Sequence, residues 1–312
     1  MSNNEATVLD ITKPTIVNRV EWFDDRFYKI HLGDGTFDYL PSVTTILEVV
    51  NKPHLANWRG QVGNEAADKK MNDAARRGSA IHHAAAILSK GGRVDWINSD
   101  LEEDPDREKI LATMRYFHGD RFYAMRCTQD VWLQVVRFVQ WWNAINPTLL
   151  MSEQNLFNLD LRLAGTLDFL INVKEGEYMI NGAKKLKLVG GLYIVDLKTG
   201  SQVDDNYFLQ ISAYTKMLPK EVQEKVVGGM IVHTNASTRT GIVGVATHLR
   251  SDVQLAEDFK DFTAVHTLWQ RKNEVEKPRI LELPTSLTLQ ELAGPRPGTE
   301  GEAAEQTERK VA

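Results

Sequence analysis

The stretch Tyr193–Gly200, with the sequence YIVDLKTG, decides the fold that we expect for this chain. Its apolar residues predict a β-strand, in which alternate side chains lie on opposite faces. The residues on either side of Asp196 therefore point into a core, whereas Asp196 and Lys198 share the other face, about 6–7 Å apart along the strand. Gly200 ends the strand, so the acid and the lysine lie together at a strand end beside an open edge. A solvent-facing strand with a paired Asp and Lys is the simpler interpretation of this stretch alone.

The sequence on both sides of this stretch alternates between the patterns of strands and of helices. Strands are indicated by alternating apolar residues between turn signals, and helices by apolar residues at helical spacing. The expected strands are Gln154–Leu159, Leu163–Val173, Glu177–Ile180, Lys187–Lys198, Met230–Thr234 and Ile242–His248. The expected helices are Asn64–Leu88, Thr128–Ala144, Asp204–Met217 and Asp252–Lys272, and the charged stretch Asp100–Arg126 is expected to be helical in part. This order predicts an α/β fold with a central mixed β-sheet flanked by helices.

Three regions are expected along the chain. Residues 1–40 hold short antiparallel strands and form an N-terminal β-hairpin region. Residues 41–284 form the main domain, which contains a helical lobe at about 60–146, and its first helix begins near Ser42. Residues 285–312 are expected to be a disordered tail, because they lose the apolar periodicity and end in a stretch rich in Gly, Pro, Glu and Thr.

Composition narrows the class of protein. The 312 residues are 42% hydrophobic, which is enough for a sizeable core, and the formal net charge of −5 argues against binding to nucleic acid by bulk charge alone. The single cysteine, Cys127, excludes a disulfide within the chain and a four-cysteine metal site. The N-terminus has no apolar signal sequence, and no apolar run approaches the ~20 residues of a membrane helix. A cytoplasmic protein without a membrane segment is expected.

A second carboxylate stands inside an apolar strand. In Leu163–Ile171, with the sequence LAGTLDFLI, Asp168 has apolar residues on both sides. Because burial of a lone carboxylate is costly, Asp168 needs a partner or a metal ion. Gly165 indicates that backbone or ligand approaches closely at this point. The alternative is an aspartate at a turn or at the N-cap of a helix.

Two helical stretches carry further polar candidates. Gln210 and Tyr214 lie one turn apart on the same helix face, where they would meet a phosphate or a base. Packing is the plainer role for a tyrosine on such a helix. Gly78 is unfavourable inside a helix by roughly 1 kcal/mol relative to alanine, and it would leave space beside His82. A histidine on a helix is more often structural or solvated than a ligand.

The order of these motifs resembles the RecB-like branch of the PD-(D/E)XK nuclease superfamily. The matching stretches, in chain order, are Gly78–His82, Gly165–Asp168, Asp196–Lys198 and Gln210–Tyr214. An upstream stretch, Leu40–Leu47 with Leu55 and Trp58, is similar to the start of phage exonucleases and of the mitochondrial genome maintenance exonuclease. The resemblance spans about residues 40–214 and implies a restriction-endonuclease-like core.

The resemblance also implies a metal site. In the family, the aspartates of the second and third motifs bind divalent metal, so Asp168 and Asp196 would hold Mg²⁺ or Mn²⁺ and, with Lys198, would be the catalytic residues. The His82 imidazole and the Leu197 carbonyl would be further ligands, with the adjacent histidine as the alternative to His82. Mg²⁺ prefers oxygen ligands, and an imidazole ligand makes Mn²⁺ a good substitute. An iron–sulfur cluster, which some relatives bind through four cysteines, is excluded by the single cysteine.

Other residues are candidates for substrate contacts. Lys198 would stabilise hydroxide or the charge that develops on phosphorus, and Gln210 and Tyr214 would position DNA. Glu153 adds a carboxylate to the site or is a surface residue. Phosphate contacts are expected from Arg76, Arg77, Lys184, Lys185 and Lys187, although the lysines also suit a solvated hairpin. Bases would stack on Trp58, Trp141 or Trp142, although core packing is expected for Trp142.

The resemblance to exonucleases implies an enzyme that acts on DNA ends, single-stranded or resected, in phage-type recombination, replication or repair. DNA is the expected partner, together with a recombinase or a single-strand-binding protein. A structure-specific endonuclease with the same site is the first alternative. The second is a non-catalytic DNA-binding recombination protein, which would need a lost ligand, yet His82, Asp168, Asp196 and Lys198 are all present.

Overall fold

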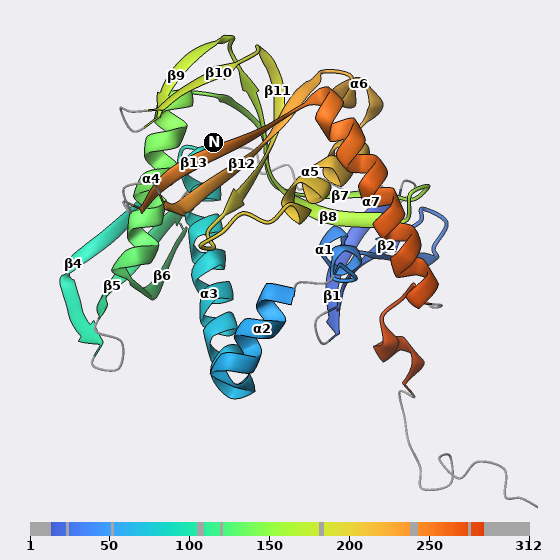
Figure 1. Cartoon of the computed structure of the whole chain (residues 1–312), viewed down its shortest axis with the longest axis horizontal. Helices are drawn as coiled ribbons and strands as arrows, with labels where there is room; N and C mark the ends of the chain where they lie inside the picture. The colour runs from blue at the N-terminus through green and yellow to red at the C-terminus, as the bar shows by residue number, and fades with distance from the viewer. Residues whose placement is uncertain are drawn as a thin grey trace, which may run out of the picture.

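The computed structural model describes residues 14–22, 25–50, 53–104, 109–118, 121–180, 184–237, 243–273 and 276–283 (Figure 1). The tail expected at 285–312 lies outside the described residues. Within the described part, no helix combines the length and the apolar character that crossing a membrane requires.

A mixed sheet forms the centre of the fold. Among the described residues it has five strands, in the order β13–β12–β11–β8–β7 (Figure 1). They are β7 (Thr148–Asn158), β8 (Leu163–Val173), β11 (Gly191–Lys198), β12 (Val226–Ser237) and β13 (Val243–Ser251). β11 runs antiparallel to β8 and parallel to β12, which confirms the expected mixed sheet. β11 is the central strand, so the expectation of an open edge beside it was wrong.

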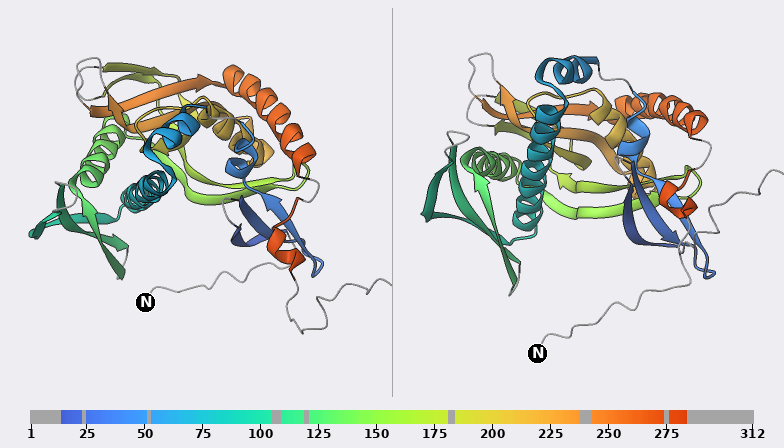
Figure 2. Two further views of the ribbon diagram at one scale, coloured as in Figure 1. Left: turned by 60° about the horizontal axis from the view of Figure 1, so that its bottom comes forward. Right: turned by 90° about the horizontal axis from the view of Figure 1, so that it is seen from below.

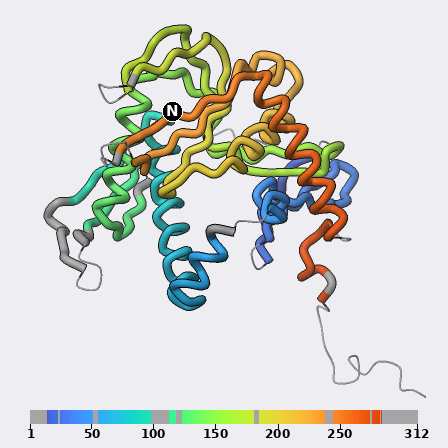
Figure 3. Tube along the Cα trace, viewed as in Figure 1, coloured from blue at the N-terminus to red at the C-terminus, as the bar shows by residue number. Residues whose placement is uncertain are grey.

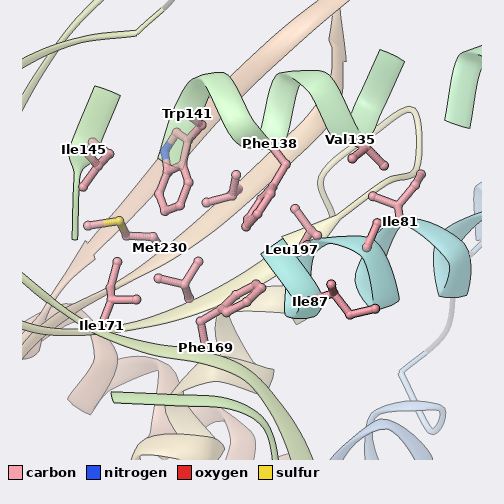
Figure 4. Close-up of a cluster of buried hydrophobic side chains, with 14 of the residues drawn as sticks. Ile81, Ile87, Val135, Phe138, Trp141, Ile145, Phe169, Ile171, Leu197 and Met230 are labelled. Carbon is pink, nitrogen blue, oxygen red and sulfur yellow. The ribbon is translucent and has the colours of Figure 1, made fainter. Parts of the chain in front are cut away.

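Helices cover both faces of this sheet (Figure 2). On one face, α3 (Asn64–Ser89) and α4 (Gln129–Ile145) share a buried cluster with Val195 and Leu197 of β11, and Figure 4 shows this cluster. On the other face, α5 (Asn206–Met217) and α7 (Asp252–Lys272) share a second cluster with Ile194. Each large apolar side chain that becomes fully buried contributes roughly 1.5–3 kcal/mol. The sheet is therefore held between two apolar layers, and the predicted α/β architecture is confirmed.

The N-terminal region forms an antiparallel sheet of its own, as expected. Its strands are β1 (Thr15–Trp22), β2 (Asp25–His31) and β3 (Phe37–Pro41). The helix expected after Ser42 is α1 (Val43–Leu47), and the Ser42 side chain caps it by accepting a hydrogen bond from the Thr45 N–H. An isolated parallel bridge joins Ser42 to Ala164, so this sheet is connected to β8.

The lobe between α3 and α4 is not helical throughout. The described residues between 93 and 128 form an antiparallel sheet of β4 (Arg93–Asp104), β5 (Lys109–His118) and β6 (Arg121–Thr128), which lies at one side of the molecule in Figure 1. The expectation of partial helix at 100–126 was wrong. The charges hid a period of two, because Ala112, Met114 and Tyr116 all point inward while their neighbours do not.

The remaining elements follow the sequence closely. α2 (Pro53–Val62) precedes α3, and α2 and the N-terminal half of α3 project away from the sheet in Figure 3. The strand expected at 187–198 is divided at Gly190, so that β10 (Lys184–Leu188) pairs with β9 (Gly176–Ile180) and β11 begins afterwards. α6 (Lys220–Gln223) and the 3₁₀ helix η1 (Arg279–Glu282) are short. α7 has the expected bounds and begins with a capping box of Ser251 and Gln254.

Candidate active site

A cavity of about 640 Å³ opens where α3, the central sheet, α5 and the N-terminal strands meet. Its lining includes His82, Glu153, Asp168, Asp196, Lys198, Gln210 and Tyr214. The fold therefore brings to one place the acids, lysine, histidine, glutamine and tyrosine that the sequence predicted, although these residues come from five different elements.

The two aspartates meet because β8 and β11 separate at this point. The ladder between these strands ends at the pair Val195 and Phe169. Beyond it, the Leu197 N–H donates to Asp168 Oδ2 at 2.7 Å, so a carboxylate takes the place of a backbone acceptor. The N–H and the C=O of one strand residue point to the same side. The Leu197 carbonyl therefore faces the same gap, as a ligand at this position requires.

Asp196 begins a chain of polar contacts with α5. Its Oδ2 lies 2.8 Å from Lys198 Nζ, and its Oδ1 accepts from Gln210 Nε2 at 3.2 Å. Lys198 Nζ donates to Gln210 Oε1 at 3.1 Å, and Gln210 Nε2 donates to the Tyr214 hydroxyl at 2.8 Å. The amide of Gln210 thus holds the acid, the lysine and the tyrosine in one arrangement.

One oxygen of this chain remains incompletely satisfied. Asp196 Oδ2 is fully buried and, despite its closeness to Lys198 Nζ, receives no hydrogen bond of good geometry from any described residue. The ion pair with Lys198 compensates its charge, but the oxygen keeps a lone pair that no hydrogen bond from the described residues uses. Such an oxygen is typical of a site that a ligand completes.

A second group lies on the other side of Asp168. His82 Nδ1 is 3.2 Å from Asp168 Oδ1 and 3.9 Å from Glu153 Oε1. Glu153 lies opposite Asp168 because the flanking pairs are Ser152 with Phe169 and Gln154 with Leu167. One ligand atom from each of His82, Glu153 and Asp168 falls within 4.8 Å of the others.

Charge and burial act against each other at these groups. Burial opposes the imidazolium of His82, but the Asp168 carboxylate raises the pKa of His82 to about 9. Burial likewise opposes the Asp168 carboxylate, yet His82 and Lys198 hold the pKa of Asp168 below its usual value. Burial raises the pKa of Asp196 to about 6 and that of Glu153 to about 7, and Asp168 adds to both shifts. Three carboxylates share two cationic partners, which favours an additional cation.

The donor set fits a divalent metal ion. Carboxylates, a carbonyl and one imidazole are the ligands that Mg²⁺ and Mn²⁺ accept. With octahedral ligands at about 2.1 Å, adjacent ligand atoms lie about 3.0 Å apart and opposite ones about 4.2 Å apart. The distances from His82 Nδ1 to Asp168 and Glu153, 3.2 and 3.9 Å, lie in this range. Asp196 lines the same cavity, although among the described residues it does not belong to the group of His82, Glu153 and Asp168 whose ligand atoms converge.

The two glycines of the motifs make room for side chains of this chain. A Cβ on Gly165 would lie 2.6 Å from Tyr214 Cε1, so Gly165 allows the tyrosine ring to pack on β8. A Cβ on Gly78 would lie 3.2 Å from Thr199 Oγ1. Gly78 therefore lets α3 approach the end of β11, and it lines the same cavity as His82.

The predicted DNA contacts divide into several groups. Arg77 lines a different cavity and pairs with Asp130 at 3.3 Å. Lys185 is exposed on β10, where it pairs with Glu177 at 3.5 Å, and it does not line the cavity of the aspartates. Among the other basic candidates, Arg76 pairs with Asp73 and Lys187 is exposed on β10, whereas the Lys184 side chain lies outside the described part. Of the tryptophans, Trp58 lines the same cavity as Arg77, and Trp141 and Trp142 pack in the core.

Sequence reasoning missed the contribution of the N-terminal strands. Arg19 and Arg26 line the cavity, and both pair with Glu21. The Arg26 backbone is fastened to the start of α1, because its N–H donates to Thr45 Oγ1 at 2.7 Å and its carbonyl accepts from the Ser42 N–H at 2.8 Å. The stretch around Ser42 was noticed as a similarity, but no signal in it pointed to an arginine of the preceding hairpin.

A comparison with models of known protein families finds no match for this chain, and a comparison with curated proteins finds none either. The resemblance to the RecB-like nucleases therefore rests on the four ordered motifs and on the upstream stretch.

Proposed function

We propose that this protein is a divalent-metal-dependent deoxyribonuclease with a restriction-endonuclease-like core, and that it hydrolyses phosphodiester bonds at DNA ends. One observation carries the proposal. Two buried aspartates, a lysine and a histidine lie in one cavity where β8 and β11 separate. Burial of this much charge is costly for a purely structural role, whereas metal-dependent hydrolysis of a phosphodiester requires such a group.

The residues divide into metal ligands and a cation. His82, Asp168, Asp196 and the Leu197 carbonyl would hold Mg²⁺ or Mn²⁺, and Glu153 would complete the set. When bound, the ion supplies Lewis-acid chemistry, which polarises the phosphate and lowers the pKa of a coordinated water. The carboxylates keep the ligand oxygens at fixed positions through their contacts with His82, Leu197 and Gln210.

Lys198 serves as the cation beside the reacting phosphate. Its Nζ lies between Asp196 Oδ2 and Gln210 Oε1, and 4.2 Å from the centre of the Tyr207 ring. Although burial opposes its charge, Asp196 and Asp168 keep the pKa of Lys198 above its usual value. A fixed ammonium at this place stabilises the negative charge that develops on the phosphoryl oxygens. Gln210 and Tyr214 act through Lys198 and Asp196 as positioning residues.

The test is digestion of end-labelled DNA by the purified full chain. Linear single-stranded and duplex DNA should be degraded with Mg²⁺ or Mn²⁺, circular DNA should persist, and EDTA should stop the reaction. Asp196→Asn should reduce cleavage by at least about 10³-fold, because it removes a charged ligand oxygen at the reacting centre. Asp160→Asn, at an exposed acid on the β7–β8 turn, is the matched control and should cleave at the wild-type rate.

Each alternative has its own outcome. Cutting of circular DNA favours the structure-specific endonuclease. DNA binding without cleavage, with either ion, favours the non-catalytic recombination protein. Cleavage by Asp196→Asn at the wild-type rate contradicts the proposed site. A role in recombination, replication or repair, with a recombinase or a single-strand-binding protein as partner, follows from the resemblance and belongs to the same proposal.

A further inference from the structure

A second cavity, of about 660 Å³, lies against α3 beside the candidate active site. The residues Lys70, Ala74, Arg77 and Ile81 follow one another at helical spacing and line this cavity, whereas Ala75, Gly78 and His82 line the first. The wall also includes Trp58 of α2, the segment Thr199–Gln202, and the polar residues Asp130, Gln134 and Asn235. The two cavities therefore occupy neighbouring faces of the same helix.

The boundary between the cavities is narrow. Lys198 lines the active site, and the next residue, Thr199, lines the second cavity. Thr199 also lies against Gly78, at 3.2 Å from the position that a Cβ would take there, so α3 and the end of β11 touch at this point. The second cavity therefore lies directly on the other side of this contact from Lys198.

The chemistry of the second cavity suits a nucleotide. It offers the indole of Trp58, which is partly exposed, and the ammonium of Lys70 lies 6.0 Å from the ring centre. Arg77 adds a guanidinium, which is 40% exposed and paired with Asp130. The side chains of Gln202 and Asn235 add amide donors and acceptors. An aromatic face stacks on a base, lysine and arginine bind phosphate, and amides hydrogen-bond to base edges.

We propose that this cavity binds an unstacked nucleotide of a single-stranded DNA segment, with its base on Trp58 and its phosphate between Lys70 and Arg77. The proposal rests on the proposed function, because it takes the bound polymer to be DNA. A base in a duplex is covered by its neighbours and has no free face for the indole, so the cavity would select single strands. The chain as a whole is acidic, which makes a local cationic pocket more important for holding a phosphate.

The test measures binding without cleavage. A fluorescent oligothymidylate and a duplex of equal length are titrated in EDTA with the wild type, Trp58→Ala, Trp58→Phe and Lys70→Ala. Trp58→Ala should weaken single-strand binding about tenfold and Trp58→Phe by less, with little change for the duplex. Lys70→Ala should make the slope of log K against the logarithm of the salt concentration less steep by about 0.7, as expected when one phosphate contact to a single strand is lost.

Two controls make the result specific. Lys69→Ala changes an exposed lysine on the same helix that is not part of this cavity wall, and it should leave both the affinity and the salt dependence unchanged. An oligonucleotide with abasic sites should bind the wild type more weakly than the intact oligonucleotide does. With the abasic oligonucleotide, Trp58→Ala should cause no further loss of affinity, because the base that would stack on the Trp58 indole is already absent.

The outcomes also separate this inference from the proposed function. Trp58-dependent binding of single strands by a protein that cleaves no DNA supports the subsite and contradicts the nuclease. Wild-type single-strand affinity in both Trp58→Ala and Lys70→Ala overturns the subsite, whatever the nuclease activity. Equal losses for single strands and duplex overturn the single-strand preference. Lys70 is exposed, so the result with Lys70→Ala stands even if Trp58→Ala unfolds the protein.

Discussion

Glu153 has a backbone conformation that glutamate rarely adopts. Its φ of 51° lies in the left-handed region, which costs a residue with a side chain roughly 1–2 kcal/mol. Its neighbours Ser152 and Gln154 keep their pairing with β8, so the strain is confined to the residue whose carboxylate faces His82. Strain of this kind collects at functional sites, where the surrounding structure holds it in place.

The first prediction at the residue scale concerns this strain. Glu153→Gly should be more stable than Glu153→Ala by about 1 kcal/mol in urea unfolding, because glycine adopts a positive φ at little cost. Both variants should bind Mn²⁺ more weakly. At Gln154, an exposed position without a positive φ, the order should be reversed, with alanine better than glycine by about 0.5–1 kcal/mol. If Glu153→Ala were more stable than Glu153→Gly, the left-handed conformation at residue 153 would carry no strain.

At the scale of elements, the site depends on the close approach of α5 to the sheet. The Tyr214 ring fills the space above Gly165 of β8, and the Tyr214 hydroxyl accepts from Gln210. Gln210 in turn bonds to Asp196 and Lys198 of β11. The distance between the helix and the sheet therefore sets the positions of Asp196 and Lys198.

Gly165→Ala tests this coupling. The added Cβ would lie 2.6 Å from Tyr214 Cε1, so the Tyr214 ring must move, alone or together with α5, at a cost of about 1–3 kcal/mol in stability. Nuclease activity should fall further than the remaining folded fraction explains, because Gln210 moves with the helix. Gly60→Ala is the matched control, since a Cβ there meets nothing within 4 Å, and it should stabilise α2 by up to about 1 kcal/mol. Thermal unfolding and activity at a temperature well below the transition measure both effects, and full activity in Gly165→Ala would contradict the coupling.

At the scale of the whole molecule, the site is assembled from segments that are far apart in the chain. Arg19 and Arg26 come from the N-terminal sheet, His82 from α3, and Lys198 from the central strand. Each segment is held by its own apolar cluster or cap, so the charged groups are brought together by packing on both faces of the sheet. The site therefore exists only in the folded protein, and a metal ion that binds there must stabilise the fold.

Metal binding should thus be visible in global stability. Mn²⁺ at about 100 times its dissociation constant should stabilise the wild type by about 2.7 kcal/mol. For a chain of this size that corresponds to a rise in Tm of several degrees, at about 2–4 °C per kcal/mol. Asp168→Asn should remove most of this rise, and EDTA should reverse it in the wild type. Asp160→Asn should keep it. An equal rise in wild type and Asp168→Asn would show that the ion binds elsewhere.

Much of the fold could be predicted from local patterns. The period of two in β8 and β11, the helical spacing in α3 and α4, and the cap at Ser42 are properties of neighbouring residues, so the sequence displays them directly. The stretch 100–126 was mistaken because its charges obscured the alternation that packing against α3 and α4 decides. Of the site residues, Asp168, Asp196 and Lys198 stood out, because charged groups inside apolar strands are unusual.

By itself, the sequence determined most of the strands and helices outside residues 93–128, and which residues carry charge at positions that ought to be apolar. Only the tertiary structure decided that Glu153 lies opposite Asp168, that Asp196 is buried beneath α5 rather than exposed at an edge, and that Arg26 of the N-terminal sheet faces the same cavity. The physical reason is range. Side-chain periodicity and capping act over a few residues, whereas burial, desolvation and the meeting of charges depend on which distant segments pack together.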